Sequence, residues 1–432
     1  MGSRKPREIA VTILKRRAAG ADYVETLLNT ELAAAAPPPK DRALCQELVY
    51  GVVRWQAALD WLIARKTNAR PQETVLKILL RIGLYQIFWL DRIPGHAAVH
   101  ETVELAKRNG FGAQSGFINA VLRGYLREFD TVKSRLAELK TTQPALGYSH
   151  PEWLWTRWQN RWGAERAAQL MDWNNTPPKT YARVNTLKTD AGKLLEQWRD
   201  ENVEYDFFRR DWTGENLVFE LKSFPPLAQL ASFQQGLFYV QDPSTLLAVH
   251  GLNVQPGEAV LDLCAAPGGK TTYIAQLLQN HGRILALDVS TERTKLTEEN
   301  CRRLGVTCVK TDGFSPLAPR ASYFDKVLVD VPCSNTGVMR RRVDLRWRIK
   351  PEQIGRLRAT QLELLRQASA ALKPAGTLVY STCSLEPEEN HEPVKQFLAE
   401  RTDCKLVNER QLLPLVDQVD GAYVAELVRS PS

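Results

Sequence analysis

Two cysteines stand in polar surroundings at the ends of two predicted strands. Cys333 lies in the segment Asp330-Val-Pro-Cys-Ser334, and Cys383 lies 50 residues later in Ser381-Thr-Cys-Ser384. Both follow a glycine-rich loop, Cys264-Ala-Ala-Pro-Gly-Gly-Lys270, of the kind that lets a backbone approach a nucleotide-like ligand. A cofactor loop followed by two thiols suggests chemistry in which a thiolate adds covalently to a substrate.

The simpler reading of any cysteine is a small buried hydrophobic residue. We keep this reading for Cys45, Cys301, Cys308 and Cys404, and we expect Cys264 mainly to pack, with its backbone facing the cofactor. The seven cysteines show neither the paired spacing of a zinc site nor the density of a disulfide scaffold. His96 and His100 lack an obvious third ligand, so no metal is expected.

The C-terminal half alternates predicted strands and helices, which is typical of a doubly wound sheet with helices on both faces. The predicted strands are 259–263, 283–288, 306–309 and 324–329. The last three end at Asp288, Asp312 and Asp330, and carboxylates at successive strand ends line the crevice where open sheets bind ligands. Asp288 stands 20 residues after Gly268, where a carboxylate can accept hydrogen bonds from the hydroxyls of a ribose.

Each of these features has a simpler explanation when it is taken alone. Gly268 and Gly269 would form a tight turn at a helix start, and Asp288 would cap a helix. Helix capping alone does not readily explain why several successive strands each end in an aspartate. The chain lacks the G-x-G-x-x-G of nicotinamide-binding loops and the first glycine of a Walker sequence. A cofactor with a ribose and no pyrophosphate fits better, and we predict S-adenosylmethionine.

The first third of the chain carries the entire positive excess of +8. Residues 1–140 hold 22 Lys and Arg against 14 Asp and Glu, whereas the remainder holds 35 of each sign. The asymmetry favours a polyanionic partner, nucleic acid first, with a well-solvated helical surface as the alternative. Apolar residues recur here at helical spacing, as in Val75, Ile78, Leu79 and Ile82, and proline and glycine breaks predict five or six helices.

We predict three domains. They are an all-α domain over residues 1–135, a small α/β subdomain over 145–235, and an α/β doubly wound, Rossmann-like domain over 236–432. Residues 130–148 have weak periodicity and are interpreted as a linker. No apolar run approaches the roughly 20 uninterrupted residues of a membrane span, and the first residues lack the apolar core of a signal peptide. We therefore expect a cytoplasmic protein without a membrane partner.

Four segments resemble the successive motifs of the RNA cytosine-C5 methyltransferase family: LDLCAAPGGKTT, ALDVS, DVPCSNTG and YSTCSLEPEEN. The helical first third is similar to the NusB antitermination fold, on the segments ALCQELVYGVVR, IGLY and FINAVLR. Val331 and Asn335 replace the alanine and glycine that are commonest in the family's DVPCSNTG-type motif. Because they leave the reactive residues intact, we expect altered packing and retained activity.

The resemblance implies methyl transfer from S-adenosylmethionine to carbon 5 of a cytosine in 16S rRNA, which the family would place at cytosine 967. A thiolate that adds to carbon 6 makes carbon 5 nucleophilic, and a carboxyl group near ring nitrogen 3 eases the addition. Chemistry alone leaves open which thiol attacks. The family implies that Cys383 attacks, Cys333 assists release and Asp330 contacts the base, with Lys270 or the bound sulfonium as the charge that ionises Cys383. The implied cofactor residues are Cys264, Ala265, Ala266, Pro267, Gly268, Gly269, Lys270, Asp288, Asp312 and Asp330.

Two basic stretches follow Cys333, at 340–342 and 346–348, and the second contains a tryptophan. We interpret them as a guide for an RNA strand, with a solvated loop as the alternative. The expected partner is 16S rRNA, free or in an early small-subunit particle, bound by a monomer that reaches an unstacked base. Two other functions stay open: an assembly or antitermination protein with an inactive methyltransferase half, and a methyltransferase for tRNA. Intact Asp288, Asp330, Cys333 and Cys383 argue against the inactive form.

Overall fold

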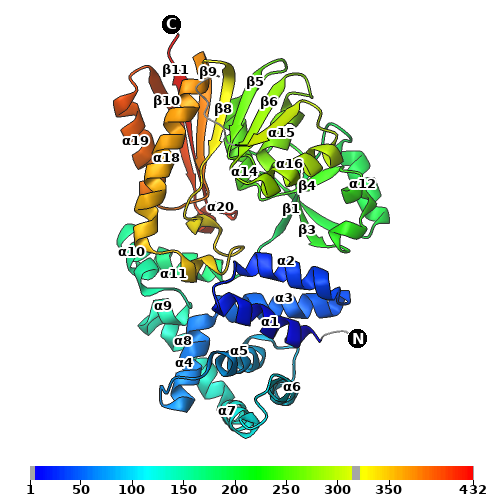
Figure 1. Cartoon of the computed structure of the whole chain (residues 1–432), viewed down its shortest axis with the longest axis vertical. Helices are drawn as coiled ribbons and strands as arrows, with labels where there is room; N and C mark the ends of the chain where they lie inside the picture. The colour runs from blue at the N-terminus through cyan, green and yellow to red at the C-terminus, as the bar shows by residue number, and fades with distance from the viewer. Residues whose placement is uncertain (1–4, 314–321, 432) are drawn as a thin grey trace. The chain divides into compact units, whose positions relative to one another are not determined.

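In a computed structural model of the protein, residues 5–313 and 322–431 are described. The chain divides into two compact units (Figure 1). The first comprises residues 1–176 together with the distant segment 339–348, and the second comprises 177–338 together with 349–432. The three-domain division made from the sequence is a finer one and stays a prediction.

The first unit is helical throughout its regular structure. Its described helices are α1 (Pro6–Ala18), α2 (Val24–Ala35), α3 (Pro39–Arg54), α4 (Gln56–Thr67), α5 (Thr74–Trp89), α6 (Gly95–Arg108), α7 (Ser115–Arg127), α8 (Phe129–Thr142), α9 (Pro144–Gly147), α10 (Glu152–Trp162), α11 (Ala164–Asn174) and α17 (Leu345–Arg348). Seven of these helices end by Arg127, one or two more than expected, because the bend between α3 and α4 at Trp55 has neither proline nor glycine to mark it.

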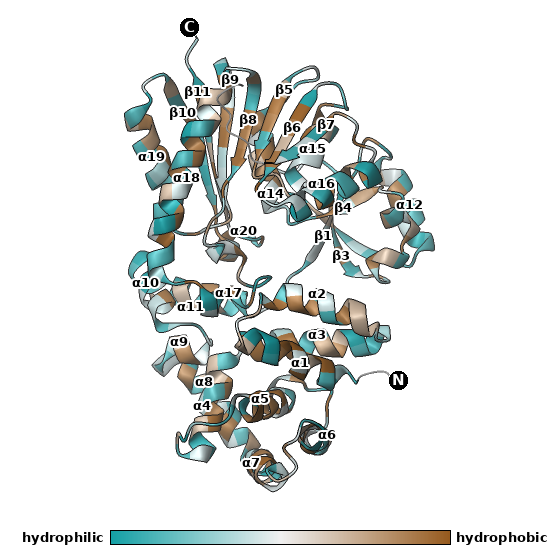
Figure 2. Ribbon diagram, in the orientation of Figure 1, coloured by the Kyte–Doolittle hydropathy of each residue, from teal (hydrophilic) through white to brown (hydrophobic). Residues whose placement is uncertain are grey.

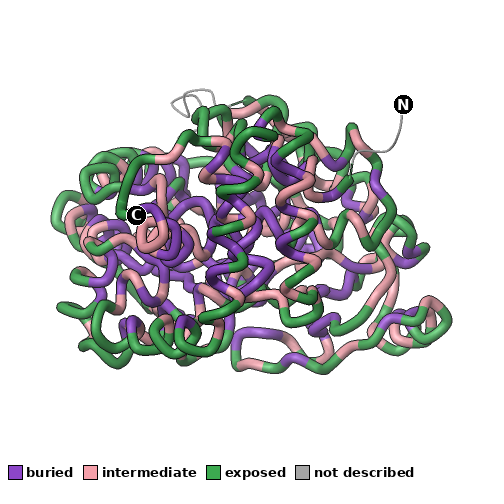
Figure 3. Tube along the Cα trace, turned by 90° about the horizontal axis from the view of Figure 1, so that it is seen from below, coloured by how far each residue is buried: buried purple, intermediate pink, exposed green. Residues whose placement is uncertain are grey.

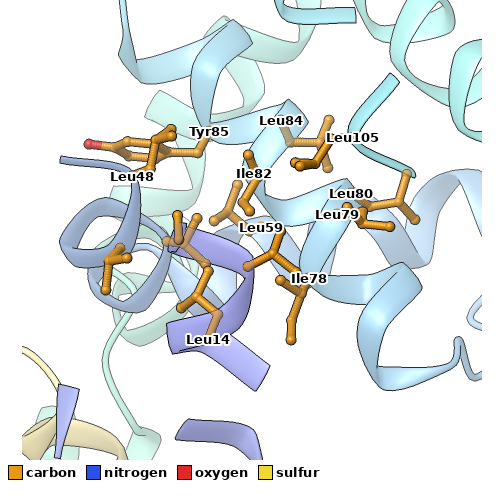
Figure 4. Close-up of a cluster of buried hydrophobic side chains, with 14 of the residues drawn as sticks. Leu14, Leu48, Leu59, Ile78, Leu79, Leu80, Ile82, Leu84, Tyr85 and Leu105 are labelled. Atoms are coloured by element: carbon orange, nitrogen blue, oxygen red, sulfur yellow. The ribbon is translucent and has the colours of Figure 1, made fainter. Parts of the chain in front are cut away.

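Helix α5 is the centre of this unit. It is apolar on nearly every side, and a helix of that kind is stable only when it is buried. Figure 4 shows its side chains Ile78, Leu79, Leu80 and Ile82 in one cluster with leucines from α1, α3, α4 and α6. In α3, a Cβ on Gly51 would lie 1.9 Å from the Tyr85 ring, so the glycine lets this α5 side chain lie against α3.

The linker expected over residues 130–148 is wrong, because this stretch forms α8 and α9. Val132 is fully buried, Leu139 is nearly so, and Leu136 packs against the same core. These three residues follow the i, i+4, i+7 spacing of one helix face. Only three apolar residues mark that face, which is why the periodicity looked weak.

The second unit begins with a small antiparallel sheet in the order β2-β3-β1-β4. Its elements are β1 (Thr180–Val184), α12 (Ala191–Asp200), β2 (Glu204–Phe208), β3 (Val218–Ser223), the 3-10 helix η1 (Leu227–Gln229), α13 (Ala231–Gln234) and β4 (Phe238–Val240). Trp198 of α12 is fully buried and its ring meets the rings of Phe219 and Phe238 edge-on. This aromatic cluster holds α12 against the sheet.

A seven-stranded sheet in the order β10-β11-β9-β8-β5-β6-β7 forms the rest of the unit. Strands β9, β8, β5, β6 and β7 are parallel, whereas β10 and β11 are antiparallel additions at one side. The strands are β5 (Ala259–Leu263), β6 (Arg283–Asp288), β7 (Val309–Gly313), β8 (Phe324–Asp330), β9 (Leu372–Thr382), β10 (Cys404–Leu412) and β11 (Ala422–Arg429). The third predicted strand lies about three residues later than expected, as β7.

Helices cover both faces of this sheet, as the alternating pattern predicts (Figure 1). One face packs against α14 (Ser244–Leu252), α15 (Gly269–Leu277) and α16 (Thr291–Leu304), and the other against α18 (Pro351–Ala371) and α19 (His391–Glu400). In β5, Val260 belongs to the first core and Leu261 to the second. Figure 2 shows the apolar central strands between helices that carry polar residues on their outer sides. The remaining short helices are η3 (Thr336–Val338), η4 (Pro387–Glu389) and α20 (Pro414–Asp417).

Buried and exposed stretches alternate along the chain trace in Figure 3, as amphipathic elements require. Within residues 5–313 and 322–431, no helix is both long and apolar enough to span a lipid bilayer.

Candidate active site

The glycine-rich loop joins β5 to α15 at the carboxyl end of the parallel strands. Gly268 has a φ of +96°, and a Cβ there would lie 2.9 Å from Thr297 Cγ2, so another residue would be strained and crowded. A Cβ on Gly269 would lie 3.1 Å from the Tyr239 ring. The two glycines let Thr297 and the Tyr239 ring pack closely against the start of α15. Burial raises the pKa of the nearby Cys264 thiol to about 12, which suits the packing role expected for it.

Asp288, the last residue of β6, fastens this loop to the next one. Its Oδ2 accepts a hydrogen bond from the Ala266 N–H at 3.1 Å, and its Oδ1 accepts one from the Ser290 N–H at 3.1 Å. The Arg293 guanidinium lies 3.4 Å from the same Oδ1. Val289 follows at once and is 80% exposed, an apolar surface that the sequence reasoning did not single out. In the sequence, the only indication that Val289 lies at this site is its position directly after Asp288.

The strand register brings the other predicted acids to the same edge of the sheet. In the β6–β7 pair, Asp312 stands opposite Leu287, one residue before Asp288. In the β8–β9 pair, Asp330 stands opposite Ser381. Because these strands are parallel, their carboxyl ends meet at one side, as the sequence pattern predicted.

Asp330 lies between a lysine and a serine. Lys270 Nζ donates to Asp330 Oδ2 at 2.6 Å, and Ser381 Oγ donates to Oδ1 at 2.7 Å. Burial on its own would lower the pKa of Lys270, but the Asp330 carboxylate outweighs it and leaves that pKa raised. The lysine therefore stays protonated at neutral pH, and it lines the same pocket as Cys383.

The two cysteines that the sequence placed 50 residues apart meet in space. Cys333 Sγ lies 3.3 Å from Cys383 Sγ. The hydrogen bond with Cys383, together with burial, raises the pKa of Cys333 well above its ordinary value, so this thiol holds its proton.

Asn335 does more than alter packing, contrary to expectation. Its Oδ1 accepts from Cys383 Sγ at 3.0 Å and its Nδ2 donates to the Cys333 carbonyl at 2.6 Å, two bonds that a glycine could not make.

A pocket opens onto the half-buried Cys383. Its walls include Lys270, Asp330, Ser381, Thr382, Asp242 and Asp420. Asp242 Oδ1 accepts from the backbone N–H groups of Ser244 at 3.0 Å and of Asp420 at 3.2 Å. Neither Asp242 nor Asp420 was identified from the sequence, where Asp242 looks like an ordinary residue before a helix. In the described part of the chain, no group of three or more His, Cys, Asp or Glu is placed to hold a metal ion.

Arg340 and Arg346, one from each basic stretch after Cys333, do not have the predicted role of guiding RNA. Arg346 is fully buried in the first unit, where its guanidinium donates to Asn175 Oδ1 at 2.7 Å and to the Asn174 carbonyl at 2.9 Å. Arg340 is buried over the Trp173 ring, 4.2 Å from its centroid. Both arginines are structural, because a guanidinium enclosed by carbonyl groups and an aromatic face cannot also reach a phosphate. Figure 2 places α17, which contains Arg346, beside α11.

Comparisons with known proteins match the chain in three parts. A family model described as 16S rRNA methyltransferase RsmB/F matches residues 249–428, the NusB family model matches 4–127, and a model of the ferredoxin-like domain of RsmF/B-like methyltransferases matches 150–210. The probable ribosomal RNA small subunit methyltransferase B of Bacillus subtilis is 36% identical over 407 residues, which are 92% of this chain and 89% of that protein. The chain belongs to the RsmB family.

Other similarities agree with membership of the RsmB family. Ribosomal RNA small subunit methyltransferase B of Klebsiella pneumoniae is 36% identical over 403 residues, which are 90% of each chain. The crystal structure of PH0851 shares the fold, with a TM-score of 0.79 over 99% of both chains at 24% identity. The predicted NusB-like helical domain and Rossmann-like methyltransferase domain are confirmed. The predicted enzyme class, an rRNA methyltransferase, and the cofactor, S-adenosylmethionine, are confirmed as well.

The residues of this RsmB-family chain fit S-adenosylmethionine. The glycine-rich loop leads into the N-terminus of α15, and Asp288 places a carboxylate at the end of the next parallel strand. These are the two features that a ribose-containing ligand without a pyrophosphate requires at this edge.

Asp262 of β5 makes the stability of the second unit depend on pH. It is fully buried, and burial raises its pKa to about 7, although Thr271 Oγ1 donates to it at 2.6 Å. Between pH 4 and 7 the folded chain keeps a proton that the unfolded chain has lost. The free energy of unfolding therefore falls as pH rises through this window, by about 1.4 kcal/mol per pH unit from this group. Urea unfolding at pH 5, 6, 7 and 8 measures the slope.

The matched variants for this prediction are Asp262→Asn and Asp206→Asn. The first removes the buried titrating group and should flatten the slope, whereas the second removes an exposed carboxylate of β2 and should leave it as in the parent protein. Equal slopes for the parent and Asp262→Asn between pH 5 and 7 would show that Asp262 is not the source.

Proposed function

We propose that this protein methylates carbon 5 of a cytosine in 16S rRNA, at the position called cytosine 967 in the family, with Cys383 adding to carbon 6 of the base. The observation that carries the proposal is that Cys383 lines the pocket beside Lys270, with a second thiol 3.3 Å away. Membership of the RsmB family supports 16S rRNA as the substrate. A ribosomal RNA substrate in turn favours a cytoplasmic protein.

The addition step assigns a role to each group in the pocket. The thiolate of Cys383 forms a bond to carbon 6 and shifts electron density to carbon 5, in the pocket that also holds the Lys270 ammonium. Asp330, fixed by Lys270 and Ser381, contacts the polar edge of the cytosine. When bound, S-adenosylmethionine supplies the methyl group on a sulfonium that carbon 5 can attack.

Release needs a second group. After methyl transfer, carbon 5 bears both a proton and a methyl group, and the proton must leave before the bond between Cys383 and carbon 6 can break. Cys333 is adjacent, and its raised pKa makes its thiolate a strong base once it has ionised. Once Cys333 has lost its own proton to water, its thiolate accepts the proton from carbon 5, the 5,6 double bond forms again, and Cys383 departs as a thiolate.

The cofactor residues are assigned on the same basis. The backbone from Cys264 to Lys270 borders the cofactor, Asp288 accepts from the ribose hydroxyls, Asp312 lies near the adenine, and Asp330 borders both cofactor and base.

We also propose that the chain has three domains, at 1–135, 145–235 and 236–432, and that it acts as a monomer.

Transfer of a labelled methyl group to RNA, followed by bisulfite sequencing, tests the proposal. The purified protein should label 16S rRNA, and a deletion strain should lose one methylated cytosine in that RNA. A lost mark in tRNA with unchanged 16S rRNA would identify tRNA as the substrate. Absence of methyl transfer to any RNA would favour the assembly or antitermination protein.

A further inference from the structure

One buried carboxylate joins the two cysteine segments. Glu389, in η4, is fully buried. Its Oε1 accepts from the Ser334 N–H at 2.8 Å, and its Oε2 accepts from the hydroxyls of both Ser334 and Ser384. Ser334 directly follows Cys333, and Ser384 directly follows Cys383. The two hydroxyls are also 3.0 Å from each other.

The donors around Glu389 match an ionised carboxylate. A carboxylate has about four acceptor positions, and a fourth donor, Gln361 Nε2, fills the last at 3.0 Å from Oε1. Burial raises the pKa of Glu389, while the bonds from Ser334 and Ser384 oppose that rise. An amide in its place would have one acceptor oxygen and would present N–H groups to the serine hydroxyls. Both serine hydroxyls would then have to turn and accept instead of donate.

The surrounding structure fixes the position of Glu389 itself. The Tyr380 hydroxyl, on β9, donates to the Glu389 carbonyl at 2.6 Å. Gln361 Nε2, on α18, also donates to the Pro332 carbonyl at 2.9 Å, one residue before Cys333. The carboxylate is thus tied to a central strand, to a covering helix and to both cysteine segments.

We propose that Glu389 is a positioning residue that holds Cys333 and Cys383 within reach of each other, so that addition and release occur on one bound base. The inference rests on the proposed roles of the two thiols. It concerns the distance between them, which can be measured without RNA or methyl transfer.

Phenylarsine oxide reports that distance, because its trivalent arsenic bonds to two neighbouring thiols with loss of one water. In the parent protein, the reagent should protect Cys333 and Cys383 together from iodoacetamide, as read by mass spectrometry of the peptides. In Glu389→Gln, protection should need about tenfold more reagent or more, since small displacements of reacting groups have large effects. Glu392→Gln, which removes a half-exposed carboxylate paired with Arg358, is the matched control and should behave like the parent.

Ser334→Ala and Ser384→Ala provide a second route if Glu389→Gln does not fold. Each removes one hydroxyl that bonds to the carboxylate, and each should weaken the double protection by a smaller factor. Full protection in a folded Glu389→Gln protein, or in both serine variants, would overturn the inference.

Kinetics give the third readout. Glu389→Gln should lower kcat by about 10- to 100-fold while the KM for RNA changes by less than about threefold, because positioning affects the reacting groups more than binding. A raised KM with an unchanged kcat would assign Glu389 to RNA binding and would contradict the proposal. If the parent protein transfers no methyl group, the proposed function fails, and the arsenical experiment still decides the role of Glu389.

Discussion

The Cys333→Ala variant is expected to accumulate a covalent protein–RNA adduct, whereas Cys383→Ala is expected to form none. Addition of Cys383 to the base precedes removal of the proton from carbon 5. Without the Cys333 thiol 3.3 Å away, the adduct therefore forms and cannot resolve. Loss of Cys383 should lower kcat by on the order of 10⁴-fold or more, the scale found when a nucleophile is removed. A denaturing gel with labelled 16S rRNA and S-adenosylmethionine separates the two variants.

Cys301→Ala serves as the control for these variants. Cys301 is buried in α16, where burial raises its pKa to about 12, and it belongs to the core against the sheet. Its replacement should leave adduct chemistry unchanged apart from a modest loss of stability. A gel with the adduct only in Cys383→Ala would reverse the assigned roles, and adducts in neither variant would argue against covalent addition.

The Asp344→Asn variant should strongly destabilise the first unit. Asp344 is fully buried, with Arg17 Nε 2.7 Å from its Oδ1 and Arg348 Nε 2.9 Å from its Oδ2. The Val24 N–H also donates to Oδ2 at 3.3 Å. Removal of one member of a buried ion pair costs about 3–5 kcal/mol, because the remaining charge stays buried without compensation. Urea unfolding, followed by far-ultraviolet circular dichroism and by limited proteolysis of the helical unit, measures the loss.

Arg16→Gln is the neighbouring control. Arg16 also lies in α1 and pairs with Glu31 at 2.6 Å, but its side chain is 44% exposed. An exposed pair of this kind contributes about 0–1 kcal/mol. If Asp344→Asn cost no more than Arg16→Gln, residues 339–348 would not be an integral part of the first unit.

Local patterns in the sequence were sufficient for strands β5, β6, β7 and β8 and for the cofactor loop, but not for the antiparallel strands β10 and β11. Strands β5 and β6 consist mainly of buried apolar residues, which only a sheet covered on both faces can bury. Gly268 and Gly269 stand where the chain must turn sharply into α15. The acids at the strand ends were predicted together because parallel strands place all their carboxyl ends at one edge. Each of these predictions depended on residues close together in the chain.

Contacts between distant residues left no such pattern. Arg346 and Trp347 looked like an RNA-binding surface, since charge beside an aromatic residue has the same appearance whether it is buried or exposed. The Arg346 guanidinium is instead buried beside Asn174 and Asn175, 171 to 172 residues earlier. Glu389 was one of several acids in the EPEEN segment, and only the folded chain distinguishes it, by bringing Ser334 and Ser384 to its carboxylate.

The membership of residues 339–348 in the first unit affects how the chain is made. Arg17 emerges early from the ribosome, but its buried partner Asp344 is synthesised only after the 162 residues from 177 to 338, which belong to the second unit. At about 5–20 residues per second, that interval lasts about 8–30 s. Until then the helical unit lacks α17, and the Asn174 carbonyl lacks the guanidinium that bonds to it. The helical unit therefore cannot be completed until residues 177–338 of the second unit have been synthesised.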